Sequence, residues 1–554
     1  MITFADEQRR NPWEGWRPWL VALAIYAVVL SIYLPFRAET GTDFRDFWQT
    51  AKEFRETGNL SADLGVHNYL PFFTFFMLPW SVFPLQVAIV LFSLLSLALF
   101  ATTVLLTEIM LHDGLPPKPR PATLMALGLM LPYIISCNIL GQLALLLVFL
   151  IVVGWFLVVR GQEWEAGIAF GLAALIKIFP VVLVGFLFLK GRWRAGVSAI
   201  AVMIALGLGG TLAALGWERT VTQHREFVER AVVDHSAKAT IFAEKPIKAK
   251  YNNNALPMVL RRLLSPVDYD PAEGRAAKTI NFVSLPSSAI WLIYLGVAAG
   301  AITLAIAAIV RSRGIWPPRD LDQLCALQAQ FGAWCCLMLV LTPLFWTHYL
   351  PVLYWPLAFL ADRADRYRRA EQRVHPFTTL MLLLWLAGVL ALASDAARAA
   401  GAQLLSAIAL FAGCVYWAWH CGGTREMPPA QRVQHRLKSA EDARKSPWET
   451  EAPAERSPIC DLYLASGLKT RPTGCCAGGL ITGPAGSRRG WEGEAPAEPL
   501  RAIPQMESKL LLLGSVFLMT ARRELRPPKG IVTCLDNEPS WNETCRNLTG
   551  GRRT

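Results

Sequence analysis

Long apolar runs without charge are the feature that most constrains how this chain can fold. Residues 19–36, 85–107, 195–216 and 286–310 contain no charged residue, and neither does the block 121–159, which is long enough for two spans. A run of about 18 or more apolar residues is typical of a transmembrane helix. Of the whole chain, 53% is hydrophobic and only 17% is charged. The sequence therefore predicts an all-α polytopic membrane protein.

The apolar runs predict about eleven spans, or eleven to twelve helices and half-helices if one span is broken. They lie near 19–36, 85–107, 121–137, 140–159, 166–189, 195–216, 286–310, 323–342, 346–361, 375–394 and 400–419. Two long polar segments, 37–84 and 217–285, interrupt them. We expect residues 1–424 to form one transmembrane domain.

The C-terminal segment 425–554 has a different composition. WETEAPAER (448–456) recurs as WEGEAPAEP (491–499), with Pro, Gly and mixed charge around both copies. Such near-repeats are typical of low-complexity sequence that does not pack into a core. We expect 425–554 to be a largely disordered cytoplasmic tail.

Basic loops indicate the topology, because Lys and Arg accumulate on the cytoplasmic side. The basic loops 190–194, 311–319 and 362–373 would all face outside if the N-terminus were inside and 166–189 crossed once. A break at Lys177 and Pro180 within 166–189 would return all three to the cytoplasm, since Pro interrupts a helix. The segment 70–84 is a second candidate for the extra crossing, and an inverted N-out topology is a third solution.

This topology places both long polar segments outside the membrane and explains the net charge of +12 without nucleic acid. We expect a multi-pass protein of the inner or plasma membrane, with membrane lipids around it and no nucleic-acid partner.

The stretch GTDFRDFWQTAKEF (41–54) predicts an amphipathic helix on the outer surface. Phe44, Phe47, Trp48, Ala51 and Phe54 share one face at helical spacing. Asp43 falls at the edge of that apolar face, and Asp46 points further toward water. They could be a helix cap and a first-turn acid. Alternatively, Asp43 could act as general base on a bound hydroxyl at the lipid boundary.

Other polar residues lie at the predicted outer ends of spans or in the outer loops. Lys177 stands alone in an apolar run, where a cation is a functional candidate by default, although it could snorkel to the interface. His348 could instead be an ordinary interfacial residue of an aromatic belt. The further candidates for substrate or donor-phosphate binding are Asp46, Tyr69, Gln142, Asn253, Asn254, Arg261 and Arg262, and the last four could also belong to a solvated loop leading into a short helix.

Together these motifs resemble glycosyltransferase family 87, whose members have the GT-C membrane fold and use polyprenyl-phosphate-linked sugars. The motifs occur in the order DFxxFxxxA, YLPxF, GQ, IKxFP, NNxL and TPxxWxHY, across roughly residues 19–420. Two positions depart from the family pattern: Phe47 stands where Tyr is common, and Ala255 stands where Ser is usual.

The resemblance implies roles for individual residues. Asp43 would be the general base, Asn253 and Asn254 would match the family's asparagine loop, and His348 would lie near the donor pocket. Lys177, with Arg261 or Arg262, would bind the donor phosphate, and together with the catalytic His348 they would stabilise it as it leaves. Transfer of a hexose, with mannose as the family's best-known donor sugar, would go to a glycolipid or glycan acceptor with inversion. Cations can stabilise the leaving phosphate by themselves, so we expect no metal and no cofactor.

Two other classes of protein fit parts of the sequence. A transporter or lipid flippase would explain Lys177 in a broken helix. A non-catalytic membrane scaffold would suit the low-complexity tail. Neither explains the ordered polar motifs at the outer ends of the spans.

Overall fold

The computed structural model describes residues 14–40, 42–60, 69–112, 116–244, 249–270, 276–311 and 321–422. All regular elements in these ranges are helices, which confirms the predicted all-α class; one isolated bridge joins Asn253 to Trp346. The predicted tail 425–554 lies outside the described residues.

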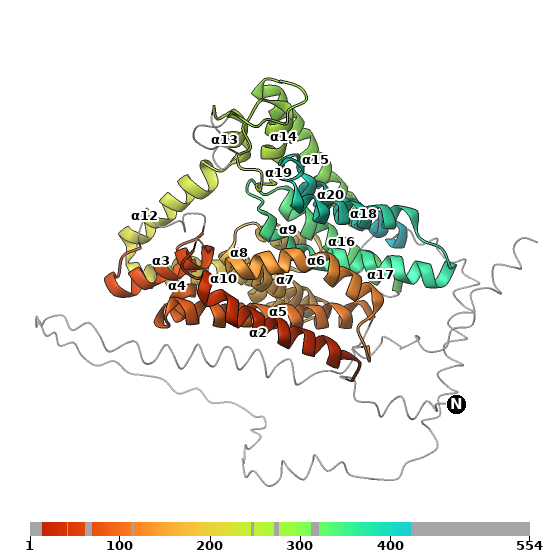
Figure 1. The fold of residues 1–554 in the computed structure, drawn as a ribbon, viewed down its shortest axis with the longest axis horizontal. Helices are drawn as coiled ribbons and strands as arrows, with labels where there is room; N and C mark the ends of the chain where they lie inside the picture. Colours follow the sequence, from red (N-terminus) through yellow and green to blue (C-terminus); the bar gives the residue numbers. More distant parts are fainter. Residues whose placement is uncertain are drawn as a thin grey trace, which may run out of the picture. The chain divides into compact units, whose positions relative to one another are not determined.

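The helices of the described ranges follow one another closely along the chain (Figure 1). In order they are η1 (Glu14–Trp16), α2 (Arg17–Arg37), α3 (Asp43–Thr57), α4 (Phe72–Met77), η2 (Leu78–Val82), α5 (Leu85–His112), α6 (Pro121–Leu140), α7 (Ala144–Val159), α8 (Glu163–Ile176), α9 (Val181–Leu189), α10 (Trp193–Val202), η3 (Met203–Gly210), α11 (Thr211–Leu215), α12 (Trp217–Phe227), η4 (Val228–Val233), α13 (Ala237–Phe242), α14 (Leu256–Leu264), α15 (Ser287–Arg311), α16 (Leu321–Val340), η5 (Thr347–Leu353), α17 (Tyr354–Glu371), α18 (Pro376–Leu390), η6 (Ala391–Ala393), α19 (Asp395–Ala399) and α20 (Ala402–Gly422).

Eight helices of the described residues are long and apolar enough to cross a membrane. They are η1 with α2, α5, α6, α10 with η3 and α11, α15, α16, α18 with η6, and α20. The remaining predicted spans fall on shorter or divided helices: α7, the pair α8 and α9, and η5 with α17. The polytopic membrane class is therefore confirmed.

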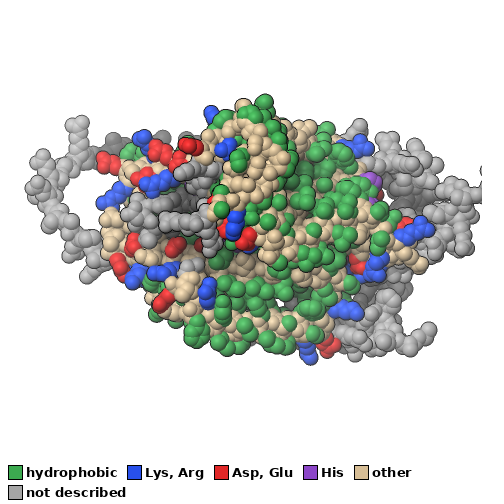
Figure 2. Space-filling model, turned by 45° about the horizontal axis from the view of Figure 1, so that its top comes forward, with side chains coloured by type: hydrophobic (Ala, Val, Ile, Leu, Met, Phe, Trp, Pro, Cys, Tyr) green, Lys and Arg blue, Asp and Glu red, His purple; other side chains and the backbone are tan. Residues whose placement is uncertain are grey.

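The surface of these helices is apolar over wide areas (Figure 2). Along α2, large side chains such as Ile25, Ile32 and Phe36 are exposed. Surfaces of this kind on a protein are typical of contact with lipid. The interior is aromatic: Trp155 of α7 stacks on Phe331 of α16 with ring centroids 4.3 Å apart. Such packing joins helices that are far apart in the sequence.

The predicted break within 166–189 is confirmed. Helix α8 ends at Ile176, Lys177 is extended, and α9 starts at Val181 after Pro180. Arg192 donates to the Glu163 carboxylate at 2.8 Å, so the chain returns to the end at which α8 began. At 14 residues, α8 is about 21 Å long, which is shorter than the roughly 30 Å of a bilayer core. The pair α8 and α9 thus forms a hairpin, as the predicted topology requires.

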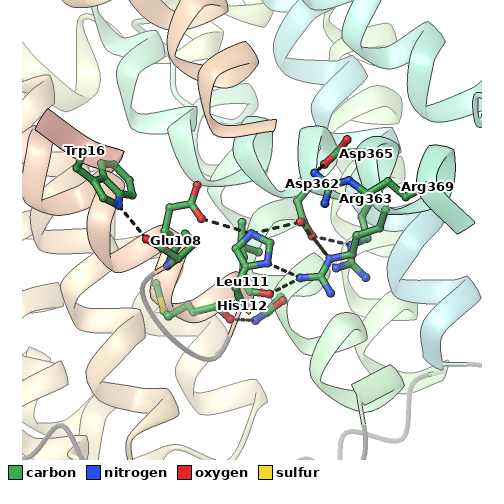
Figure 3. A network of polar contacts seen from close by, with 12 residues as sticks. Trp16, Glu108, Leu111, His112, Asp362, Arg363, Asp365 and Arg369 are labelled. Carbon is green, nitrogen blue, oxygen red and sulfur yellow. Dashed lines mark hydrogen bonds and ion pairs between the residues drawn. The ribbon is translucent and has the colours of Figure 1, made fainter. Parts of the chain in front are cut away.

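A buried polar network joins the C-terminal end of α5 to α17 (Figure 3). The Nε2 atom of His112 lies 3.4 Å from Glu108 and 3.5 Å from Asp362. Arg363 and Arg366 donate to the same Asp362 carboxylate. Arg366 also lies 2.7 Å from Nδ1 of His112. Because Arg can only donate, Nδ1 accepts, and the ring proton sits on Nε2, facing the two carboxylates.

The predicted loop 362–373 is wrong for most of its length, because α17 continues to Glu371. The charges that suggested a loop are paired along the helix. Asp365 accepts from Arg368 and Arg369, one turn further on. Oppositely charged side chains at this spacing stabilise a helix, which explains why α17 continues beyond its apolar part.

Candidate functional site

The carboxylate of Asp43 is held by a residue from a distant helix end. Asp43 is the first residue of α3, and the side-chain amide of Gln142 donates a hydrogen bond to its Oδ2 atom. Thr42, not Asp43, occupies the N-cap position of the helix. Gln142 is buried, and its own Oε1 atom has no hydrogen-bond partner in the described part of the chain. The structure therefore does not support the alternative in which Asp43 caps the helix.

The close approach of α3 to the turn after α6 depends on a glycine. Gly141 ends α6 with φ of +65°, in the left-handed region that favours glycine. A Cβ atom at this position would overlap the Cβ of Phe44 on α3. The absence of a side chain at Gly141 thus allows Gln142 to reach Asp43.

The predicted amphipathic face of 41–54 is confirmed in α3. Phe44, Phe47 and Ala51 are buried. Phe47 packs edge-on against Tyr69, with centroids 5.1 Å apart. Asp46, expected to point toward water, is partly buried, and burial followed by the charge of Asp43 raises its pKa.

Lys177 lies in the break between α8 and α9 and is buried among aromatic rings. Its Nζ atom donates to the Tyr349 hydroxyl at 2.5 Å. The same atom lies 3.8 Å from the centroid of the Tyr349 ring and 4.8 Å from that of Tyr69. A cation over two ring faces is stabilised by their quadrupoles, and more so away from water. We refer to Tyr69 and Tyr349 as the tyrosine cage of Lys177.

Tyr69 links this cage to Asp43. Burial, followed by the charges of Tyr349 and Asp43, raises the pKa of Tyr69 well above its ordinary value. A nearby negative charge raises the pKa of a phenol because it disfavours the ionised form, and the effect is strong only over short distances. A carboxylate and an ammonium group, on segments more than a hundred residues apart, therefore both lie near one phenol.

His348 lies beside the cage in η5. It is partly buried, and its ring centroid is 4.9 Å from that of Tyr349. The ammonium group of Lys177 interacts electrostatically with the imidazole. Of the predicted site residues, the structure therefore gathers Asp43, Gln142, Tyr69, Lys177 and His348, with Asp46 at the margin.

The two asparagines form a separate polar cluster on the segment before α14. The backbone amide of Asn254 donates to the carbonyl of Phe345 at 2.5 Å, and Asn253 forms the bridge with Trp346. The side chain of Asn254 also donates to the Thr347 hydroxyl at 3.3 Å. This segment is therefore paired with the turn that leads directly into His348.

The two arginines of α14 bond mainly to backbone carbonyls. Arg261 donates to the carbonyls of Ile241 and Ala243 and to the Ser287 hydroxyl. Arg262 is fully buried and donates to carbonyls of the preceding segment. A role in binding the donor phosphate stays a prediction for both.

Sequence reasoning did not select Tyr349 or Cys137. Tyr349 carries the hydroxyl that meets Lys177, and its signal was its place directly after His348 in WTHY. Cys137 is buried, and its thiol donates to the carbonyl of Gln142 at 3.4 Å. No sequence pattern marked it. Within the described residues, no group of three or more His, Cys, Asp or Glu side chains could hold a metal ion.

The fold and the site define a polytopic helical membrane protein with an acid and a cation gathered at the ends of its helices. Residues 67–338 match the model of glycosyltransferase family 87. Residues 67–338 are thus similar to this family, and the likeness indicates a membrane glycosyltransferase. The matched range includes Tyr69, Gln142 and Lys177, whereas Asp43 and His348 lie outside it. No curated protein and no solved structure matches the chain.

Proposed function

We propose that the protein transfers a hexose, with mannose as first candidate, from a polyprenyl-phosphate-linked donor to a hydroxyl of a glycolipid or glycan on the outer face of the membrane. The observation that carries the proposal is the gathering of Asp43 and Lys177 around Tyr69. Glycosyl transfer from a phosphate needs a base for the attacking hydroxyl and positive charge for the departing phosphate.

In the proposed reaction, Asp43 accepts the proton of the acceptor hydroxyl as its oxygen attacks the anomeric carbon. The bond from that carbon to the phosphate oxygen breaks, and its electron pair leaves with the polyprenyl phosphate. A single displacement of this kind inverts the anomeric carbon through an oxocarbenium-like state. The hydrogen bond from Gln142 orients the Asp43 carboxylate.

Lys177 and His348 stabilise the charge that grows on the leaving phosphate. A preorganised cation in a site shielded from water is well suited to this, because its charge is weakly screened there. The polyprenyl chain of the donor would stay in the bilayer. We propose that these side chains meet the phosphate without a metal ion, in which case a chelator should leave the transfer rate unchanged.

The test uses the purified full-length protein in liposomes, with polyprenyl-phosphate-linked hexoses and glycan acceptors. The proposal predicts a product with inverted anomeric configuration. Lys177→Met should lower the rate by about a hundredfold. Lys190→Met is the matched control, because Lys190 ends the same hairpin but bonds to Gln330 of α16.

Two results would overturn the proposal. Equal transfer by Lys177→Met and Lys190→Met would remove Lys177 from the site. Movement of the lipid across the vesicle membrane, without transfer of any sugar, would favour the transporter, to which a cation in a broken helix also points.

A further inference from the structure

Arg262 is a buried cation whose partners are backbone carbonyls. Its side chain is fully buried in α14. One terminal nitrogen donates to the carbonyl of Lys250 at 2.8 Å, and the other to that of Asn253 at 2.6 Å. No carboxylate of the described residues lies within ion-pair distance of this guanidinium group. A buried charge is costly unless hydrogen-bonded, so these carbonyls are what stabilise it there.

The two carbonyls belong to one turn. The backbone amide of Asn253 donates to the carbonyl of Lys250 at 3.0 Å, which closes the turn 250–253. Arg262 therefore holds both ends of this turn with its planar fork, a geometry that a lysine ammonium cannot reproduce.

The same turn is attached to the segment that precedes His348. The Asn253 side-chain oxygen accepts from the backbone amide of Phe345, and the Asn254 amide donates to the Phe345 carbonyl. Three and four residues after Phe345, His348 and Tyr349 form the part of η5 that lies at Lys177. The order of contacts thus runs from Arg262 through the turn 250–253 to the tyrosine cage.

We infer that Arg262 is a positioning residue: by fixing the turn 250–253, it sets the position of His348 and Tyr349 at the site. On this inference, its guanidinium group acts through the backbone carbonyls of the turn, in place of the phosphate contact predicted from the sequence. The effect on catalysis rests on the proposed function, whereas the effect on the mobility of 342–349 does not.

The first test measures hydrogen–deuterium exchange of the full-length protein in lipid nanodiscs. Arg262→Gln should raise the exchange of the peptides 250–256 and 342–349 by about tenfold, because the hydrogen bonds of the Asn253, Asn254 and Phe345 amides open more often once the turn is no longer held. Arg261→Gln is the matched control, because Arg261 also bonds to carbonyls but joins α13 to α15. It should leave the exchange of 342–349 unchanged. Unchanged exchange of 342–349 in a folded Arg262→Gln protein would overturn the inference.

The second test separates positioning from direct binding. Arg262→Lys keeps the positive charge but loses the fork, and it also serves if Arg262→Gln fails to fold. Positioning predicts raised exchange in 342–349 and a fall in kcat of about tenfold to a hundredfold, with little change in the KM for the donor. A raised KM with unchanged kcat and unchanged exchange would assign Arg262 to the phosphate instead. If no sugar is transferred by the wild type, the proposed function fails, and the exchange data still decide the inference.

Discussion

The side-chain amide of Gln142 donates a hydrogen bond to the carboxylate of Asp43, across 99 positions of the sequence. The contact forms because α3 lies directly against the turn after α6. It helps to fix the orientation of the Asp43 carboxylate at the start of a surface helix. This pairing distinguishes Asp43 from Asp46, which no described side chain holds in the same way.

The contact between α3 and the turn predicts a strong effect of Gly141→Ala. The left-handed backbone and the overlap with Phe44 should together cost at least about 2 kcal/mol or push α3 away. The temperature of thermal unfolding in detergent should fall, and so should the rate of sugar transfer. Gly128→Ala within α6 is the control, since nothing lies within 4 Å of its added Cβ. Equal behaviour of the two variants would contradict this account of α3.

The tyrosine cage predicts a graded response at Tyr349. Tyr349→Phe removes the hydroxyl that Lys177 meets but keeps the ring, so the transfer rate should fall about tenfold. Tyr349→Leu removes both contacts and should lower the rate further, because the ammonium group then lacks its closest ring. The measurement is kcat with saturating donor. A Leu variant as active as the Phe variant would show that the ring does not position Lys177.

The network at the other end of α5 predicts a stability effect. Asp362→Asn removes the charge that His112, Arg363 and Arg366 share, and breaking such a buried arrangement costs about 3 kcal/mol. Asp365→Asn, on the same helix, loses pairs to arginines that are about half exposed and should cost less than about 1 kcal/mol. Unfolding in a denaturing detergent series measures both. Similar losses in the two variants would argue against a structural role for the network.

The raised pKa of Asp46 predicts a pH-dependent stability difference. A carboxyl with a higher pKa in the folded state binds more protons there, so its ionisation weakens folding as pH rises above the ordinary value of 3.8. Asp46→Asn should therefore melt at a higher temperature than the wild type near pH 7, and at the same temperature below about pH 4. Melting curves across this range provide the measurement. A difference that grows toward low pH would contradict the sign.

Local sequence patterns predicted the structural elements that are determined by residues close together in the chain. The face of α3 follows from helical spacing, and the break at Lys177 follows from Pro180 and the balance of basic loops. The helical character of 362–371 was missed because its many charged residues are typical of a loop. Their pairing at helical spacing becomes visible only in the structure.

The site could be predicted only in part, for a physical reason. Asp43, Gln142 and Lys177 are each unusual in their own segments, and that made them candidates. Their contact depends on the packing of helices far apart in the chain, which no spacing encodes. Tyr349 is an ordinary aromatic residue of a span end until the fold brings Lys177 to its hydroxyl. The bonds of Arg262 to carbonyls likewise have no sequence signal.

The central claim is that Asp43 is the general base of sugar transfer. The most direct measurement compares transfer from a polyprenyl-phosphate-linked hexose by the wild type, Asp43→Asn and Asp46→Asn, in the same liposomes. We predict that Asp43→Asn loses at least about a hundredfold in rate, because the amide cannot accept the proton, whereas Asp46→Asn loses much less. Equal rates for Asp43→Asn and the wild type would contradict the account.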